Sequence, residues 1–310
     1  MKALVIGGTG FIGSHLLDRL ADEGDSVRVL APDPERFRAP LKNIDYRVGT
    51  LMDEAATRSA LEGVDIVYHL ANTKVPSTSN QDPIADIQEN LVATVGLLES
   101  MRYKGVGRIV FLSSGGTVYG ECGSDPVPED QPLQPSSSYG IVKVAIENYL
   151  GMFKRLYGLS YCVLRASNPY GPRQGAIGVQ GVIATMLYRT LQKEAISIWG
   201  DGGIVRDYVY IEDLVNGIST AGRTGLEGTF NLGSGKGHSL IDILDVIREV
   251  TRREPKVEFQ PSRKLDIQHI VLDISRIRIQ LGWEPKVPLA VGIEWHWLWM
   301  QSANRSDLPH

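Results

Sequence analysis

Short apolar runs and amphipathic segments alternate along the first half of the chain. The apolar runs predict strands at residues 2–8, 26–31, 64–71, 107–114 and 161–167. Between them, apolar residues at helical spacing predict helices at residues 11–24, 91–101 and 139–156. Buried strands separated by helices are typical of a parallel sheet with helices on both faces. The pattern therefore predicts an α/β fold with a doubly wound parallel sheet.

The regular alternation ends near residue 167. Residues 168–175 and 199–207 are rich in Gly and Pro and are predicted loops, whereas residues 238–253 predict a helix capped by Ser239. The predicted division is a Rossmann-type domain at 1–167, with 205–232 crossing back to add an edge strand, and a smaller C-terminal α/β substrate domain at 168–204 and 233–310.

Composition narrows the class of protein. The chain has 310 residues, a net charge of −4 and scattered basic residues, which argues against a nucleic-acid partner. Cys122 and Cys162 are too few and too far apart for a zinc site, so we expect no metal and a reducing, cytoplasmic setting. No apolar run is long enough to cross a bilayer, and the apolar N-terminus lacks a signal-peptide cleavage site.

Three glycines lie between the first predicted strand and the first predicted helix. Gly7, Gly10 and Gly13 allow a tight turn and let a pyrophosphate approach the free amides of the helix N-terminus. This position predicts a dinucleotide site. The acidic residue that usually binds the adenosine ribose is expected at the end of the second strand. That strand ends at Ala31, and Asp33 follows two residues later, so Asp33 either reaches the ribose or begins the next turn.

Arg36 and Arg38 follow Asp33, and as an alternative they would receive the 2′-phosphate of NADP. We favour NAD as the cofactor.

Tyr139 and Lys143 stand four residues apart in a predicted helix, so their side chains share a face. A phenol ionises near pH ~10, and an ammonium beside it favours the phenolate. Such a pair transfers a proton to or from a hydroxyl while a hydride moves elsewhere. The spacing alone is typical of a solvated helix face, and the glycine turn is what favours the catalytic interpretation.

Together these motifs resemble the extended short-chain dehydrogenase/reductase family, and within it the nucleotide-sugar 4-epimerases of the UDP-glucose/UDP-galactose type. The resemblance extends from residue 1 to about residue 300. It implies NAD-dependent epimerisation at C4 of a UDP-hexose or UDP-N-acetylhexosamine through a 4-keto intermediate. It also implies a role in carbohydrate metabolism and polysaccharide biosynthesis, and a homodimer built on the helices at 91–101 and 139–156.

The resemblance assigns site residues. Besides the glycines and the catalytic pair, the implied cofactor contacts are Phe11, Ile12, Thr50, Leu51, Leu70, Ala71, Lys74, Asn90 and Ser113. The implied substrate contacts are Asn168, Arg206, Arg263, Asp266 and Ile270. Two arginines from distant loops are suited to clamp a pyrophosphate, and Ile270 stands where some members carry an aromatic residue beside the sugar.

The chain departs from the family at the residue that orients the sugar hydroxyl. Aligned on the segment 117–120, the family's Ser or Thr falls on Gly115. We predict that Thr117 replaces it, with Ser114 as the second candidate; otherwise both hydroxyls bond local backbone. The acidic pair of related sugar dehydratases would fall on Gly116 and Thr117, so dehydration is not expected.

Two other functions fit the same residues. One is an NADPH-dependent reductase of a nucleotide 4-keto-sugar. The other is a dinucleotide-binding protein without catalysis, an interpretation that Gly115 favours and the pair of Tyr139 and Lys143 opposes. Trp295 and Trp299 are predicted to pack a C-terminal helix rather than stack on a sugar.

Overall fold

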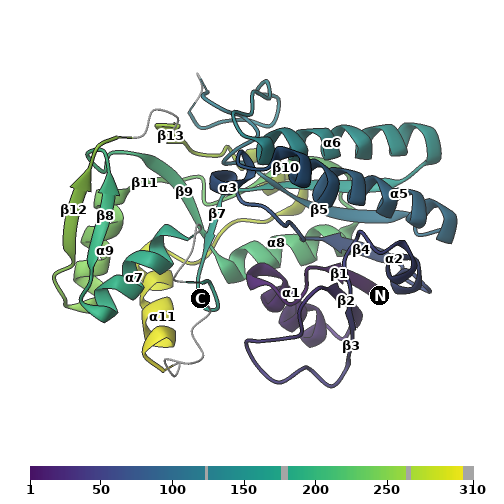
Figure 1. Ribbon diagram of the computed structural model, residues 1–310, viewed down its shortest axis with the longest axis horizontal. Helices are drawn as coiled ribbons and strands as arrows, with labels where there is room; N and C mark the ends of the chain where they lie inside the picture. Colours follow the sequence, from purple (N-terminus) through teal and green to yellow (C-terminus); the bar gives the residue numbers. More distant parts are fainter. Residues whose placement is uncertain (123–124, 176–180, 263–266, 303–310) are drawn as a thin grey trace.

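A seven-stranded parallel sheet organises the larger part of the molecule (Figure 1). The computed structural model describes residues 1–122, 125–175, 181–262 and 267–302. The order of the strands across the sheet is β10-β6-β5-β4-β1-β2-β3. Their bounds are β1 Lys2–Ile6, β2 Ser26–Ala31, β3 Ile44–Val48, β4 Ile66–His69, β5 Arg108–Ser114, β6 Ser160–Ala166 and β10 Gly228–Leu232.

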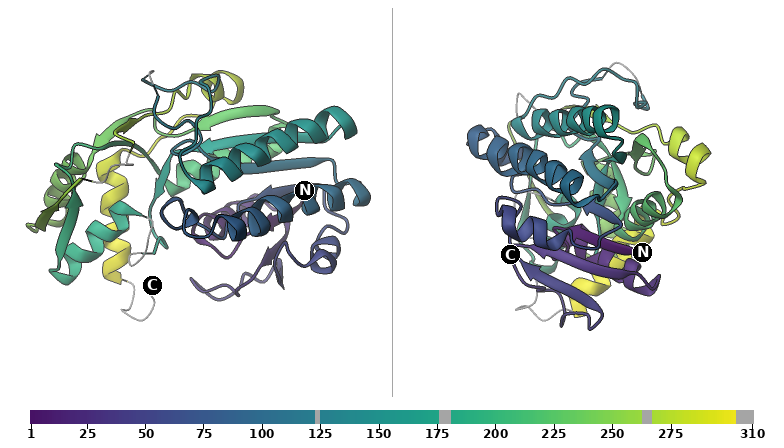
Figure 2. Two further views of the ribbon diagram at one scale, coloured as in Figure 1. Left: turned by 45° about the horizontal axis from the view of Figure 1, so that its top comes forward. Right: turned by 90° about the vertical axis from the view of Figure 1, so that its right-hand side faces the viewer.

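Helices cover both faces of this sheet (Figure 2). One face packs against α1 (Phe11–Asp22) and α8 (Ile211–Thr224). The other face packs against α2 (Glu54–Ala60), α5 (Ala93–Lys104) and α6 (Ser138–Tyr157). The short helices α3 (Pro76–Ser79) and α4 (Pro83–Asp86) and the π-helical segment η1 (Ile87–Val92) lead into α5. Because both faces are buried, the central strands β1, β4, β5 and β6 are mostly apolar, as their sequence predicts, whereas the edge strand β3 carries Asp45 and Arg47.

The smaller part of the molecule is built from short strands and three longer helices (Figure 1). Strand β9 pairs with β7, β11 and β13, and β8 pairs with β12. The strand bounds are β7 Asn168–Tyr170, β8 Ala195–Trp199, β9 Val205–Tyr210, β11 Gly237–Ser239, β12 Lys256–Gln260 and β13 His269–Ile270. The three longer helices are α7 Val182–Gln192, α9 Leu240–Thr251 and α11 Leu289–Ser302, whereas the short α10 (Ser275–Leu281) packs against β10 and α8 of the larger part.

The structure confirms most of the predicted elements. Strand β2 and helix α6 match their predictions within one residue, and the Ser239 hydroxyl caps α9 by accepting from the Asp242 amide at 3.0 Å. Strand β10 lies beside β6 at the edge of the sheet. The division into two domains stays a prediction.

Two predicted loops were partly wrong. Residues 168–170 form β7, which pairs in parallel with residues 208–210 of β9. Residues 205–207 begin β9 and pair with β11 and β13. The Gly-rich flanks of β7 and β9 look locally irregular, and only the long-range pairing makes these segments strands.

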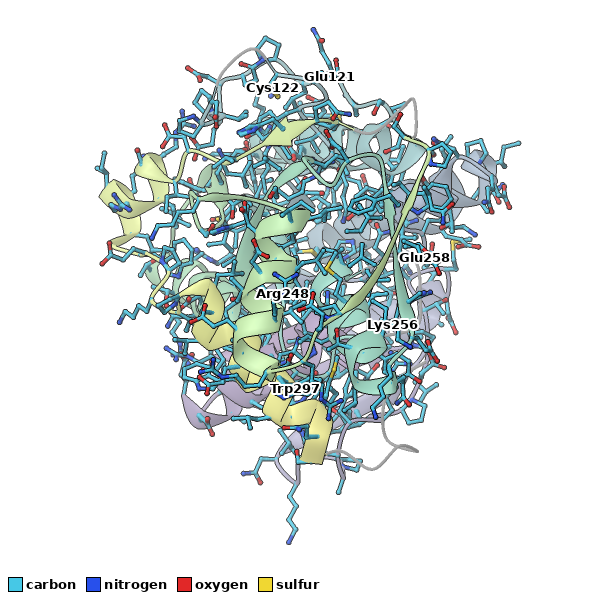
Figure 3. All side chains as sticks on the ribbon, turned by 90° about the vertical axis from the view of Figure 1, so that its left-hand side faces the viewer. Glu121, Cys122, Arg248, Lys256, Glu258 and Trp297 are labelled. Atoms are coloured by element: carbon cyan, nitrogen blue, oxygen red, sulfur yellow. The ribbon has the colours of Figure 1, made fainter. Side chains whose placement is uncertain are left out.

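Of the tryptophans predicted to pack, Trp299 packs against the core, and Trp295 is 43% exposed but lies edge-on to the Tyr210 ring, with 5.4 Å between the ring centroids. Trp297, between them on another face, was not part of that prediction. It lies below α9 (Figure 3), is 5% exposed and stacks under the Arg253 guanidinium at 5.0 Å.

A buried ion pair fixes α6 against the sheet. Arg165 on β6 contacts Glu147 on α6 at 2.7 Å, and its guanidinium also donates to the Tyr119 hydroxyl at 2.9 Å. Ser113, near the end of β5, donates to Glu147 at 2.5 Å. Since both charges are buried and fully paired, the network holds α6 in register with the carboxyl ends of β5 and β6.

Candidate active site

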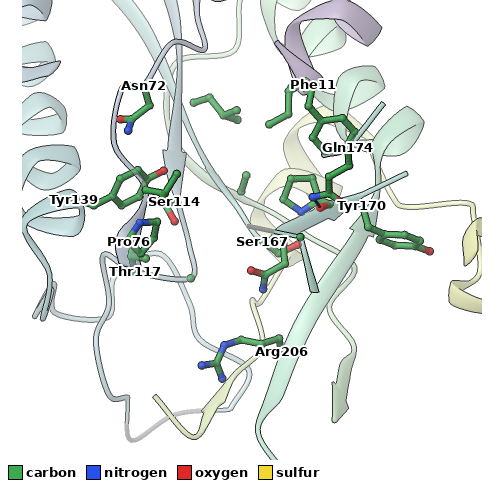
Figure 4. Close-up of a pocket in the computed structure, with 18 of the residues that line it drawn as sticks. Phe11, Asn72, Pro76, Ser114, Thr117, Tyr139, Ser167, Tyr170, Gln174 and Arg206 are labelled. Atoms are coloured by element: carbon green, nitrogen blue, oxygen red, sulfur yellow. Dashed lines mark hydrogen bonds between the residues drawn. The ribbon is translucent and has the colours of Figure 1, made fainter. Parts of the chain in front are cut away.

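A cleft of about 680 Å³ opens at the carboxyl ends of β1, β4, β5 and β6. Residues of the smaller part, among them Tyr170, Gln174 and Arg206, line its other side (Figure 4). Open parallel sheets bind ligands at this edge because loops and helix N-termini converge there. The described residues that line the cleft include three cations, Lys74, Lys143 and Arg206, and no carboxylate. The cleft is therefore suited to anionic ligands.

The glycine turn forms one wall of the cleft. Gly7 has a φ of +81°, and its amide donates to the Leu30 carbonyl at 2.9 Å. A β-carbon on Gly13 would overlap the Gly7 carbonyl oxygen. The Gly10 amide donates to the Gly7 carbonyl at 3.2 Å, but no side chain caps α1, so the amides of Phe11 and Ile12 are available to a ligand. The turn fits the pyrophosphate of a dinucleotide.

Other predicted cofactor residues lie at or beside the cleft. Leu70, Lys74 and Ser113 line it, and the backbone of Ala71 packs directly against Gly7. Asn90 lies behind the cleft. Its side chain accepts from the Thr73 amide at 3.0 Å and donates to the Thr73 hydroxyl at 2.9 Å, so it fixes the segment that carries Lys74.

The structure does not bring the adenine-side predictions to the cleft. Asp33 and Thr50 are exposed, and Leu51 packs against the core below α2. Arg38 contacts Asp18 at 2.7 Å and donates to the Ser14 carbonyl at 3.2 Å. These contacts engage both terminal nitrogens of Arg38, which turns the guanidinium toward α1 and not toward the 2′-phosphate of NADP.

Tyr139 lies in the first turn of α6 and points toward Ser114 at the end of β5 (Figure 4). The Ser137 hydroxyl caps the helix, and the Tyr139 amide donates to the Ser79 hydroxyl at 3.1 Å. Burial raises the pKa of Tyr139 to about 12, the hydrogen bond with Ser114 lowers it, and the charge of Asp86 raises it further.

Lys143 lies one turn further along α6 and is 3% exposed. Its ammonium donates to the Leu112 carbonyl at 3.0 Å and lies 5.5 Å from the Tyr139 ring centroid. Burial lowers the pKa of Lys143 to about 8, while the charges of Glu147 and Asp86 raise it. The structure corrects one expectation: without a cofactor charge, the pKa of Tyr139 is raised rather than lowered. The reason is that burial dominates and the ammonium points to the Leu112 carbonyl.

The structure also shows why Gly115 is not the hydroxyl-bearing position. A side chain there would point at Leu272 and the Arg165 carbonyl, away from the cleft. Ser114 and Thr117 both line the cleft. Ser114 is hydrogen-bonded to Tyr139, and the buried Thr117 hydroxyl has no partner within the described residues. Of the two candidates, Ser114 is thus the one in contact with the phenol.

The predicted substrate residues divide into three groups. Asn168 and Arg206 line the cleft, where Asn168 donates to the Asp207 carbonyl at 3.0 Å and Arg206 faces Tyr139 from the opposite side (Figure 4). Ile270 is 2% exposed inside a small apolar cluster, and the structure does not bring it to the cleft. Arg263 and Asp266 lie outside the described residues.

Ser167 and Gln174 are among the polar residues that line the cleft and were not predicted from the sequence. Ser167 and Gln174 are both more than nine-tenths buried, and the Ser167 hydroxyl and the Gln174 carbonyl oxygen have no partner within the described residues. Buried polar groups are nearly always hydrogen-bonded, so these atoms are suited to a ligand rich in hydroxyls. Their place in a Gly- and Pro-rich segment gave no signal of this. The described residues contain no cluster of ligands for a metal ion.

Known proteins similar to this chain include sugar-nucleotide enzymes. A profile of the NAD dependent epimerase/dehydratase family matches residues 3–233. A UDP-glucose 4-epimerase of Mycolicibacterium smegmatis is 37% identical over 302 residues, which cover 94% of this chain and 96% of that protein.

Solved structures similar to this chain include enzymes with the same name. UDP-glucose 4-epimerase of Thermotoga maritima, solved with UDP-glucose, has a TM-score of 0.93 at 36% identity and covers 97% of this chain and 99% of that one. The Thermus thermophilus enzyme, solved with NAD, has a TM-score of 0.92 at 34% identity and covers 98% of this chain and 100% of that one.

Gly10→Ala tests the glycine turn. The new methyl group would lie 3.4 Å from the Gly7 carbonyl oxygen, a distance the fold tolerates, but it would occupy the space offered to the pyrophosphate. We expect NAD affinity, measured by calorimetry, to fall about tenfold or more, which corresponds to about 1.4 kcal/mol, while Tm stays near the wild-type value. Gly96→Ala, in open space on α5, is the matched control. Unchanged NAD affinity in Gly10→Ala would remove the pyrophosphate from this turn.

Proposed function

The chain belongs to the NAD-dependent epimerase/dehydratase family, and we propose that it epimerises C4 of a nucleotide-sugar, a UDP-hexose or UDP-N-acetylhexosamine, through a 4-keto intermediate. One observation carries the proposal. Tyr139, bonded to Ser114, is a proton-transfer group in a cleft whose described lining has cations but no carboxylate. Dehydration would need an acid and a base at positions 116 and 117, which are Gly and Thr.

The residues that would hold NAD are the glycine turn at the start of α1 and the wall formed by Leu70, Ser113 and Lys143. When bound, NAD accepts the C4 hydride and returns it, and its oxidised ring carries a positive charge that favours a nearby phenolate.

Tyr139 performs the proton transfer. Its phenolate accepts the proton of the C4 hydroxyl as C4 is oxidised, and the phenol returns the proton when the ketone is reduced. Ser114, hydrogen-bonded to this phenol, stabilises the phenolate and aligns it with the hydroxyl. Burial in α6 holds the phenol at a fixed distance from the end of β5, so its position does not depend on a mobile loop.

The polar residues that line the cleft explain how the sugar can present either face to the cofactor. Arg206 and Asn168 anchor the pyrophosphate, so the sugar turns about a fixed point. Gly116 leaves space beside Thr117, and the unpartnered oxygens of Thr117, Ser167 and Gln174 offer hydrogen bonds at separate points around the cleft. The 4-keto sugar can thus be held in either orientation.

Tyr139→Phe is the direct test. Removing the phenol oxygen takes away the group that accepts the C4 proton, so kcat for UDP-sugar epimerisation should fall by about 100- to 10,000-fold. Tyr157→Phe, an exposed tyrosine on the same helix, is the control. Full activity in Tyr139→Phe would refute the assignment. Turnover of a 4-keto-sugar with NADPH, without retained NAD, would instead establish a reductase.

The pH dependence tests Lys143. Its pKa is lowered to about 8, so the ammonium that faces the cofactor wall is present below that pH and is lost above it. We expect kcat/KM to decline above about pH 8. In Lys143→Arg, whose guanidinium stays charged, the residual activity should not decline there. A wild-type profile that is flat from pH 7 to 10 would contradict the role of the ammonium.

We further infer a homodimer. Helices α5 and α6 pack side by side, and α6 exposes Ile141, Tyr149 and Leu156, which are seven or eight residues apart and so share one face. An exposed apolar stripe of this kind is typical of a protein interface. No helix in the described part of the chain is long and apolar enough to span a membrane.

Sedimentation equilibrium tests the dimer. We expect the wild-type protein to sediment at twice its chain mass and Tyr149→Asp to sediment as a monomer, because a charge would be buried at the centre of the stripe. Ile279→Asp, at an exposed position of α10, should leave the mass unchanged. A monomeric wild-type protein at micromolar concentration would exclude this interface.

A further inference from the structure

Asp86, at the junction of α4 and η1, is a fully buried carboxylate that the sequence did not single out. Its two oxygens take one hydrogen bond each from a side chain: Asn90 donates to Oδ1 at 2.9 Å, and Ser138 donates to Oδ2 at 2.7 Å. Within the described residues no cation lies within ion-pair distance of it. Burying an unpaired carboxylate is costly, so its place beside the cleft calls for a function.

The two hydrogen bonds connect the two walls of the site. On one side, Asn90 holds the backbone and hydroxyl of Thr73, next to Lys74 in the cleft. On the other side, Ser138 immediately precedes Tyr139 in the first turn of α6. One carboxylate therefore fixes the cofactor-side segment and the N-terminus of α6 relative to each other, and a negative charge is favourable at that helix end.

The charge of Asp86 acts on both members of the relay. It raises the pKa of Tyr139 and the pKa of Lys143. The fields of the other carboxylates nearby are partly balanced: Glu147 on α6 is paired with Arg165, and Glu89 on η1 lies 4.0 Å from Lys74.

The nearby histidine adds no charge. Burial and the charge of Lys143 lower the pKa of His69 on β4 to about 3, so His69 is neutral at physiological pH.

We propose that Asp86 is a positioning residue of the proton relay, which fixes the first turn of α6 through Ser138 and sets by its negative charge the pH range in which Tyr139 and Lys143 act. The inference rests on the proposed function for its kinetic consequence. Its electrostatic consequence can be measured without any substrate.

Asp86→Asn keeps the shape and removes the charge. Loss of the charge favours the phenolate of Tyr139 and disfavours the ammonium of Lys143, so both limbs of the kcat/KM profile should move to lower pH by about half a unit or more. Ser138→Ala removes the hydrogen bond and keeps the charge, so it should lower kcat and leave both limbs in place. Asp82→Asn, on the exposed cap of α4, should change neither.

Nuclear magnetic resonance of protein labelled at lysine Cε provides the substrate-free measurement. Lys143 is assigned by the signal lost in Lys143→Arg, and its titration midpoint should be lower by about half a unit or more in Asp86→Asn and unchanged in Ser138→Ala and Asp82→Asn. An unchanged midpoint in Asp86→Asn would overturn the proposal. A shifted midpoint in a protein that turns over no nucleotide-sugar would support the role of Asp86 while refuting the proposed function.

If Asp86→Asn does not fold, Asp86→Glu carries the test. It retains the charge and displaces the hydrogen bonds, so kcat should fall while the Lys143 midpoint stays within about 0.2 units of the wild-type value. If the Lys143 midpoint shifts in Asp86→Glu or in Ser138→Ala, which both retain the charge, then packing and not charge governs the relay. That result would overturn the proposal.

Discussion

The burial of the Lys143 ammonium is the constraint on which the site depends. An ammonium loses most of its hydration at 3% exposure, and the Leu112 carbonyl restores only one hydrogen bond. The charge is tolerated because carboxylates lie behind it, Glu147 on its own helix and Asp86 across the helix end. Because both carboxylates lie behind the ammonium, the described lining of the cleft contains no carboxylate and favours the binding of phosphate groups. Proton transfer is then performed by Tyr139.

The ion pair between Arg165 and Glu147 makes this arrangement rigid. Glu147 lies one helical turn beyond Lys143, and its carboxylate accepts from Ser113 while it is held by Arg165. Breaking such a buried pair on one side strands a charge, which typically costs about 3–5 kcal/mol. The same contacts that stabilise the fold therefore set the distance between α6 and the end of β5, where Ser114 meets Tyr139.

Much of the fold and part of the site followed from local sequence. The apolar runs of β1, β2, β5 and β6 are short-range patterns, and so is the four-residue spacing of Tyr139 and Lys143. The sequence did not correctly rank Thr117 and Ser114 as candidates for the hydroxyl that contacts Tyr139. An alignment on the residues after β5 does not reveal that a side chain at 115 would face Leu272, which lies more than 150 positions further along the chain.

The sequence by itself determined the parallel sheet, the glycine turn and the helix that carries the relay, because each depends on residues within a few positions of one another. Tertiary structure decided which hydroxyl meets Tyr139, that Ser167 and Gln174 line the cleft and Ile270 does not, and in which direction each pKa is shifted. It also placed Asp86 against Ser138, 52 residues away. Burial and charge proximity are set by packing between distant segments, and no local pattern encodes them.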